Sequence, residues 1–213
     1  MQVPPIVKAN FDRSFRDYWT DRLRQHLDDR YKGRQLAKMP EDLRTYQHVI
    51  EASKPDVIIE LGSGSGGSAV WFADQLQVLC GGGSVITVDI SEPQLPLGDP
   101  RVTFVQGDLA VASERVHAIV PLDKRVMLVD DSAHTYQSTM NALTLYADLV
   151  TPGCWFVVED GVVDESISVW NGAGVQPAIR DFLNTENGSR FEQQDLALYG
   201  LTTDFGGWLE AKS

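Results

Sequence analysis

Five short, strongly apolar runs recur through the middle of this 213-residue chain. They are VIIEL (57–61), SVITVDI (84–90), VTFVQGD (102–108), RVMLVDD (125–131) and CWFVVED (154–160). Helix-like segments lie between or after these runs, at 67–79, 110–118, 136–149 and 175–184. Nearly continuous apolar runs are typical of parallel strands that are covered on both faces. The alternation therefore predicts an α/β fold with a doubly wound, mostly parallel sheet.

The stretch VIIELGSGSGGSAVWFA (57–73) satisfies two cofactor fingerprints. As G-x-G-x-x-G it is the dinucleotide loop of an NAD-binding Rossmann unit, through Gly62, Gly64 and Gly67. As E-x-G-x-G-x-G, starting at Glu60, it is the S-adenosylmethionine loop of a class I methyltransferase. Asp89 ends the second apolar run, where it could hold the ribose hydroxyls of either cofactor.

Two acids favour S-adenosylmethionine over NAD. Glu60 precedes the first glycine by two positions, where we expect it to help hold the methionine end of the cofactor. Asp108 closes the third run, where we expect it near the adenine amino group. Each has a structural alternative, because Glu60 could brace the loop and Asp108 could cap the helix at 110–118.

A second group of polar residues follows the last two runs of the predicted parallel sheet. DDSAHTY (130–136) contains D-x-x-H, from Asp131 to His134, and VVEDG (157–161) contains the pair Glu159–Asp160. The carboxyl ends of parallel strands share one edge, so three carboxylates can converge there. Hard oxygen ligands in that number suit Mg²⁺, and a neutral imidazole can act as a general base. The alternative is that these acids are helix caps and solvated loop residues.

The ends of the chain depart from the βαβ rhythm. The segment FEQQDLALYGLTTDFGGWLEA near the C-terminus predicts two strands joined by a short turn. Such an ending favours the Rossmann-like class I methyltransferase fold, with seven strands and an antiparallel last strand. Residues 1–55 contain two helical stretches, 12–30 and 41–53, which we interpret as a lid or oligomer-contact segment. The predicted cofactor-binding core is 56–213, in a single domain overall.

The sequence resembles the cephalosporin hydroxylase family of S-adenosylmethionine-dependent enzymes, which includes rhamnosyl and macrolide-sugar O-methyltransferases. The resemblance is carried by YKGRQLAKMPEDLRTYQHVIEASKPDVIIELGSGSGGSAVWFA, by VDDSAHTYQSTMNALTLYADLVTPGCWFVVEDG and by GAGVQPAIRDFLNTENGSRFEQQD with GGWLEA. It implies that Asp131, Glu159 and Asp160 bind Mg²⁺ and that His134 is the catalytic base. Asp130 stands beside Asp131, so the choice of ligand between these two stays open. The resemblance also implies a cofactor site made of Glu60, Gly62, Ser63, Gly64, Gly67, Ser68, Asp89, Asp108 and Asp131.

Together these features predict a Mg²⁺-dependent S-adenosylmethionine O-methyltransferase that acts on a hydroxyl of a natural product or sugar in secondary metabolism, such as antibiotic biosynthesis. Two alternatives remain: an NAD-dependent oxidoreductase that uses the same loop, and a non-catalytic scaffold partner of a biosynthetic enzyme. A hydroxylase is disfavoured, because the sequence has no evident two-histidine iron site beside its carboxylates.

The charge of the chain bears on its partners. With 30 acidic and 18 basic residues the formal net charge is −12, which argues against nucleic acid or an anionic membrane as a partner. No apolar run approaches the ~20 residues of a membrane span, and the N-terminus lacks the apolar region of a signal peptide. We therefore expect a cytoplasmic protein, a small-molecule hydroxyl acceptor, and a homo-oligomer whose contacts use the first 30 residues.

Overall fold

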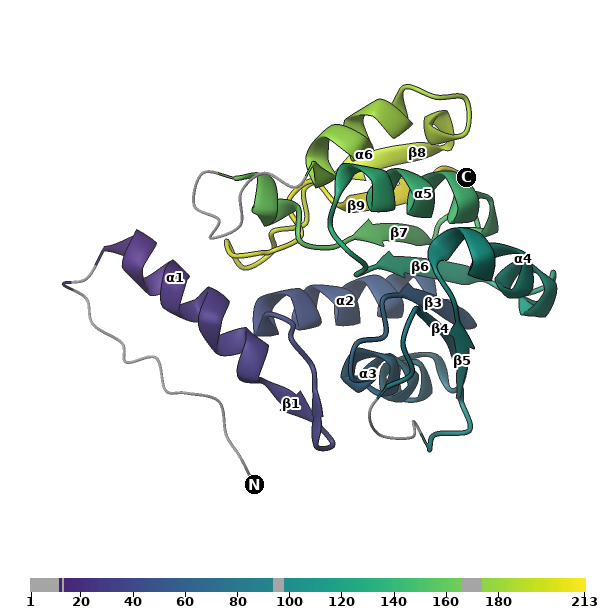
Figure 1. The fold of residues 1–213 in the computed structure, drawn as a ribbon, viewed down its shortest axis with the longest axis horizontal. Helices are drawn as coiled ribbons and strands as arrows, with labels where there is room; N and C mark the ends of the chain where they lie inside the picture. The colour runs from purple at the N-terminus through teal and green to yellow at the C-terminus, as the bar shows by residue number, and fades with distance from the viewer. Residues whose placement is uncertain (1–11, 13, 94–97, 166–173) are drawn as a thin grey trace.

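The computed structural model describes residues 12, 14–93, 98–165 and 174–213. Its centre is a seven-stranded sheet in the order β5-β4-β3-β6-β7-β9-β8 (Figure 1). The strands are β3 (Val57–Leu61), β4 (Ser84–Asp89), β5 (Val102–Gln106), β6 (Val126–Asp130), β7 (Trp155–Val158), β8 (Phe191–Gln194) and β9 (Trp208–Ala211). Strands β3 to β7 pair in parallel, whereas β9 is antiparallel to both of its neighbours. The predicted mostly parallel sheet with an antiparallel last strand is thus confirmed.

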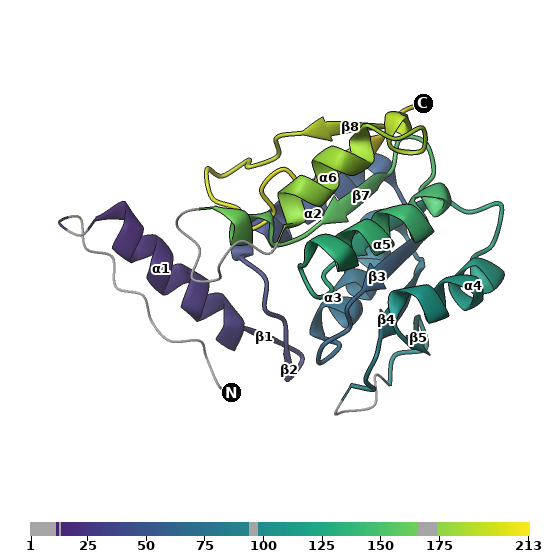
Figure 2. The same cartoon turned by 45° about the horizontal axis from the view of Figure 1, so that its top comes forward.

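Helices cover both faces of this sheet, as a doubly wound fold requires (Figures 1 and 2). One face carries α2 (Pro40–Ser53) and α3 (Gly67–Gln75), which continues as a π-helical turn at Leu76–Cys80. The other carries α4 (Leu109–Ile119), α5 (Tyr136–Tyr146) and α6 (Val175–Leu183). Short 3₁₀ turns lie at His26–Asp28, Ala147–Leu149, Gly161–Asp164 and Gly188–Arg190. In the part of the chain that is described, no helix is long and apolar enough to cross a membrane.

Local sequence explains where these helices begin. Pro40 occupies the first turn of α2, where its missing N–H costs nothing, and two acids follow it in the same turn. The side chain of Thr135 accepts a hydrogen bond from the backbone N–H of Ser138. In return, the side chain of Ser138 accepts one from the backbone N–H of Thr135, which completes a capping box at the start of α5. Asp108 caps α4 by accepting from the backbone of its first turn.

The core forms on both faces of the sheet, and Tyr46 packs helix α2 against it. Every residue of β3 and β6 is buried. Tyr46 of α2 is fully buried, with its ring centroid 5.1 Å from that of Phe72 in α3 and 4.9 Å from that of Trp208 in β9. Aromatic contacts at these separations fix α2 against the sheet.

The connection between the last two strands corrects the prediction of a short turn. Residues 195–207 separate β8 from β9, and part of this segment is buried. The backbone N–H and the hydroxyl of Thr203 both donate to Asp42 of α2, at 3.0 Å each, and Asp204 accepts from the backbone N–H of Asp160 at 3.3 Å. Such polar tertiary contacts have no periodic signal in the sequence, so the pattern alone did not show that the loop returns to the sheet edge.

Both helical stretches predicted in the N-terminal segment are present, but a hairpin that was not predicted lies between them. Helix α1 (Phe15–Gln25) and its 3₁₀ extension end before a small hairpin of β1 (Arg30–Tyr31) and β2 (Arg34–Gln35). Helix α1 lies at the side of the molecule, at the left in Figure 1. Trp19 and Leu23 on this helix pack with Met39 and Val162 in a small cluster separate from the main core.

The hairpin rests directly on the glycine-rich loop. The hydroxyl of Ser65 donates to the carbonyl oxygen of Gln35 at 2.8 Å, and a Cβ atom on Gly67 would collide with that same carbonyl. Asp74 of α3 fastens the hairpin, because it pairs with Lys32 at 2.5 Å and accepts from the Tyr31 hydroxyl at 2.6 Å.

Replacing Gly67 by alanine is expected to loosen this contact. The added methyl group meets backbone that cannot move aside cheaply, so Gly67→Ala should lower the free energy of unfolding by ~1–3 kcal/mol and speed amide hydrogen exchange in residues 30–38. Gly64→Ala is the control: its Cβ meets nothing within 4 Å, although its φ of +49° adds backbone strain. Equal exchange in the hairpin of both variants would contradict the proposed contact.

Candidate active site

The register of the parallel strands brings the predicted acids to one edge of the sheet. Leu61 of β3 pairs with Asp130 of β6, and Asp130 pairs with Val158 of β7. The residues that follow these strand ends, including Asp131 and Glu159, therefore emerge next to one another. This is the carboxyl edge, where open α/β sheets bind their ligands.

A cavity of about 730 Å³ lies at this edge beside the glycine loop. Its lining residues come from β4, from the start of α4, from α5 and from the loops after β3, β4, β5 and β6. They are Gly62, Gly64, Val88, Asp89, Ile90, Gly107, Asp108, Leu109, Ala110, Asp131, Ser132, Ala133, Ser138 and Asn141. Five predicted cofactor contacts are among them, namely Gly62, Gly64, Asp89, Asp108 and Asp131. A volume of this size is typical of small-molecule and cofactor sites.

The backbone of the glycine loop requires glycine and is braced by Asp89. Gly62 has φ +100°, and a Cβ atom there would collide with the carbonyl oxygen of Asp131. One carboxylate oxygen of Asp89 accepts from the backbone N–H groups of Ser63 and Gly64, at 3.0 Å each. Asp89 thus shapes the loop while it also lines the cavity.

Other predicted cofactor contacts lie beneath the loop. Glu60 is fully buried and accepts a 2.6 Å hydrogen bond from the hydroxyl of Thr87, which also shares a 2.6 Å hydrogen bond with Ser63. Burial raises the pKa of Glu60 to about 7, against the opposing effect of Lys38. Ser68 is buried as well. These side chains support the loop from below, and none of them lines the cavity.

Asp108 and two residues of α5 complete the description of the cavity. One oxygen of Asp108 accepts from the backbone N–H groups of Ala110 and Val111, at 3.0 Å each, so the capping role considered for this residue is real. Ser138 and Asn141 were not anticipated from the sequence. They are three residues apart in α5 and so lie on the same face of the helix. Because α5 borders the cavity, both residues line it.

The buried carboxyl of Glu60 generates a pH prediction. Its folded-state pKa of about 7 lies above the unfolded value of ~4.3, so the folded state binds the proton more tightly. The stabilisation is complete below the unfolded pKa and is lost as pH rises through the folded pKa. Glu60→Gln, which stays neutral, should lose less stability than the wild type between pH 5 and 7.5 in urea denaturation.

The control for this measurement is Glu51→Gln, because Glu51 is exposed on α2. It should keep the pH slope of the wild type. A Glu60→Gln slope as steep as that of the wild type would show that Glu60 is not the group that titrates.

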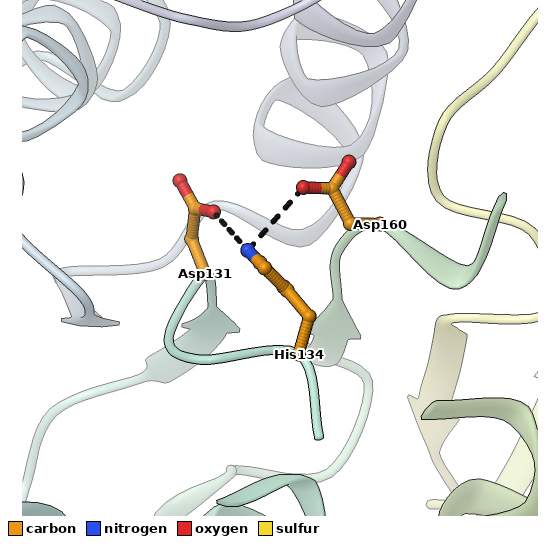
Figure 3. A group of neighbouring side chains, drawn as sticks. All are labelled: Asp131, His134 and Asp160. Carbon is orange, nitrogen blue, oxygen red and sulfur yellow. Dashed lines mark ion pairs between the residues drawn. The ribbon is translucent and has the colours of Figure 1, made fainter. Parts of the chain in front are cut away.

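Asp131, His134 and Asp160 form a group that could hold a metal ion (Figure 3). Atom Nε2 of His134 lies 3.6 Å from Oδ1 of Asp131 and 3.3 Å from Oδ2 of Asp160. One ligand atom from each residue falls within 4.8 Å of the others. All three side chains are partly exposed, so a ligand could reach them.

Backbone conformation places two of these side chains. His134 has φ +51° and Asp160 has φ +56°, a left-handed conformation that is uncommon for residues other than glycine. In Figure 3 the imidazole points between the two carboxylates. Residues held in this conformation are enriched at functional sites.

Glu159 lies next to this group but contacts different partners. Its two carboxylate oxygens accept from the ammonium group of Lys38, at 2.7 and 2.5 Å, and one of them accepts from the Tyr46 hydroxyl at 2.6 Å. The same ammonium group donates to Oδ2 of Asp131 at 2.9 Å. Burial opposes the charge on Lys38, but Asp131 and Glu159 outweigh it and raise its pKa well above the usual range.

The structure distinguishes Asp130 from Asp131. Asp130 is buried, where it accepts from the backbone N–H of Ser132 at 3.3 Å, and burial raises its pKa to about 7. Asp131 instead reaches both Lys38 and His134. Of the two neighbours, Asp131 is the one that belongs to the group around the imidazole.

Sequence reasoning missed Lys38 and Tyr46. Both lie in the stretch that carries the family resemblance, but no motif marked them. A single lysine in a segment of mixed charge is usually a surface residue. The available signal was position: Lys38 stands between Leu36 and Met39, which are both buried, directly before α2.

The donor set fits a divalent cation. Asp131 and Asp160 offer hard carboxylate oxygens of the kind that Mg²⁺ prefers, and Glu159 adds a third carboxylate beside them. Lys38 pairs with Asp131 and Glu159, so it offsets part of the negative charge of these carboxylates.

The strand order, the glycine loop after β3 and the cavity at the carboxyl edge define a Rossmann-like class I methyltransferase fold. The family described as Rhamnosyl O-methyltransferase/CmcI matches residues 24–212, and the chain belongs to this family. The resemblance noted in the sequence is confirmed.

Curated relatives share about the same level of identity with this chain. A rhamnosyl O-methyltransferase of Mycobacterium bovis (strain BCG / Pasteur 1173P2) is 29% identical over 140 residues, which is 63% of this chain and 57% of the relative. The rhamnosyl O-methyltransferase of Mycobacterium leprae is 27% identical over 135 residues, 61% of this chain and 59% of the relative. The matches therefore span less than two thirds of the length of these relatives.

Solved structures show the same fold. One described as "cmcI-D160 Mg-SAM" has a TM-score of 0.69 at 22% identity, covering 99% of this chain and 90% of its own. The O-methyltransferase from Bacillus cereus in complex with SAH has a TM-score of 0.56 at 18% identity, covering 73% of each chain.

Proposed function

We propose that this protein transfers a methyl group from S-adenosylmethionine to a hydroxyl group of a sugar or another natural product, with Mg²⁺ as the cation. The main supporting observation concerns Asp131, which lines the cavity beside the glycine loop and also belongs to the group with His134 and Asp160. A cofactor in the cavity and a cation on this group would therefore be neighbours. Membership of a family whose relatives are named rhamnosyl O-methyltransferases supports the class of acceptor.

The cavity residues would hold the cofactor. Gly62 and Gly64 leave their backbone open to close approach by a ligand, and Asp89 could accept hydrogen bonds from the ribose hydroxyls. Asp108 lines the same cavity after β5, the edge strand of the sheet, and we assign it to the adenine amino group. Glu60, Ser63, Gly67 and Ser68 would support this site from beneath. The bound cofactor supplies an electrophilic methyl group.

Asp131, Asp160 and Glu159 would hold the cation, and His134 would act as the base. We assign the imidazole this role because Mg²⁺ prefers oxygen ligands, while neutral imidazole accepts protons near pH 7. Bound Mg²⁺ supplies a Lewis acid that makes the acceptor hydroxyl easier to deprotonate. Atom Nε2 of His134 would take that proton, and the resulting imidazolium would be stabilised by the carboxylates at 3.3 and 3.6 Å.

We further propose a cytoplasmic homo-oligomer that works in secondary metabolism. Residues 1–55 would serve as the lid or oligomer-contact segment and 56–213 as the catalytic core. The scaffold alternative is less favoured, because a protein without catalysis has no need of an imidazole held between two carboxylates.

Cofactor identity can be tested by thermal shift. S-adenosylhomocysteine should raise the melting temperature, because a ligand that binds only the folded state stabilises it. NAD at the same concentration should leave it unchanged. The opposite pattern would favour the oxidoreductase and overturn the proposal.

The roles of base and cation ligand can be separated by mutation. His134→Ala should slow methyl transfer to a rhamnosyl acceptor by ~10²–10⁴-fold, while leaving S-adenosylhomocysteine affinity near that of the wild type. Excess Mg²⁺ should not restore it. Asp160→Asn weakens the cation site, so its activity should recover partly as Mg²⁺ is raised. Full wild-type activity in the presence of a chelator would show that the carboxylates do not form a catalytic metal site.

A further inference from the structure

Lys38 is the least expected side chain at the carboxyl edge. It follows β2 and precedes α2, and its side chain is 2% exposed. The residue before it, Ala37, has φ +52°, so the chain makes a left-handed step immediately before the lysine. A lysine is rarely buried this completely unless its charge is paired.

The pairing involves the two oxygens of Asp131 in different ways. Oδ2 accepts from the ammonium group of Lys38 at 2.9 Å, whereas Oδ1 faces the imidazole of His134 at 3.6 Å. Both oxygens of Glu159 contact the same ammonium group. An ion bound to Oδ1 of Asp131 would therefore lie one carboxylate group away from a fixed positive charge.

We propose that Lys38 is an internal counter-cation of this acidic cluster, which holds Asp131 and Glu159 together and competes with a divalent cation for them. Lys38 thereby sets how tightly the site binds such an ion. This inference rests on the divalent-cation part of the proposed function and adds the residue that tunes its affinity.

The physical basis is the balance of charge among the described side chains of the cluster. Asp131, Glu159 and Asp160 would repel one another strongly if no cation stood among them, and Lys38 provides one. A divalent ion can replace that compensation, but it must approach against the lysine charge in a poorly screened site. Removing the lysine charge should therefore destabilise the cation-free protein and tighten binding of a divalent ion.

The first experiment titrates MgCl₂ or MnCl₂ into the full chain by calorimetry and follows melting temperature in parallel. Lys38→Met, which keeps an unbranched side chain without charge, should bind the ion at least ~10-fold more tightly than the wild type, since the nearby like charge is gone. Without the ion it should melt earlier than the wild type, and the ion should raise its melting temperature more. S-adenosylhomocysteine affinity should change little.

Two controls separate charge from packing. Lys38→Arg keeps the charge and should retain divalent affinity near that of the wild type. Lys124→Met removes an exposed lysine, which lies 3.9 Å from Asp56, and should change nothing in the titration.

A second pair of variants covers the possibility that Lys38→Met does not fold. Glu159→Gln with Lys38→Met removes both members of the buried pair, a change that proteins often tolerate. This double variant should bind the divalent ion more tightly than Glu159→Gln alone, by a factor similar to that seen in the first experiment.

The outcomes distinguish this inference from the proposed function. If the wild type binds Mg²⁺ or Mn²⁺ and neither lysine variant binds more tightly than its parent, the role of Lys38 is wrong while the cation site stands. If the wild type and all variants fail to bind a divalent ion, the cation site itself is wrong and the inference falls with it.

Discussion

Repulsion among carboxylates at one sheet edge is the constraint that the surrounding structure satisfies. Each of these acids is compensated differently. Burial favours the neutral form of Asp130, Glu159 is held by Lys38 and Tyr46, and Asp160 faces His134. Asp131 contacts both basic partners: one carboxylate oxygen faces Lys38 and the other faces the imidazole of His134. Because this edge keeps negative charge on accessible oxygens, it is suited to attract a cation.

The N-terminal segment contributes directly to this edge. Within four residues, Gln35 contacts the glycine loop and Lys38 contacts the acids. The backbone carbonyl of Gln35 occupies the space that a side chain at Gly67 would need, so loop and segment must be placed together. One short stretch of the chain therefore contacts both the glycine loop and the acidic cluster.

The sequence was sufficient to predict the sheet, its parallel core and the edge at which the site lies, because strand runs and glycine loops have local signals. It was insufficient where the deciding contact is long-range. Nothing near Lys38 indicates that it will meet Glu159, 121 residues later. The prediction of a short turn before the last strand was wrong for the same reason. Thr203 in that segment hydrogen-bonds to Asp42, which is 161 residues away in the sequence. Whether each predicted ligand binds its cofactor stays a prediction, although the structure separates cavity-lining residues from buried supports.

Backbone strain suggests why the imidazole sits where it does. His134 and Asp160 both adopt the left-handed conformation, which is disfavoured for residues with a side chain, although His and Asp adopt it more often than most. Surrounding contacts hold them there: Thr135 caps α5 directly after the histidine, and Asp204 accepts from the backbone N–H of Asp160. The loop before β9 therefore contacts the backbone of Asp160, and the capped start of α5 directly follows His134. For the base role proposed for His134, this backbone placement matters because a general base must lie within hydrogen-bond reach of the proton that it removes.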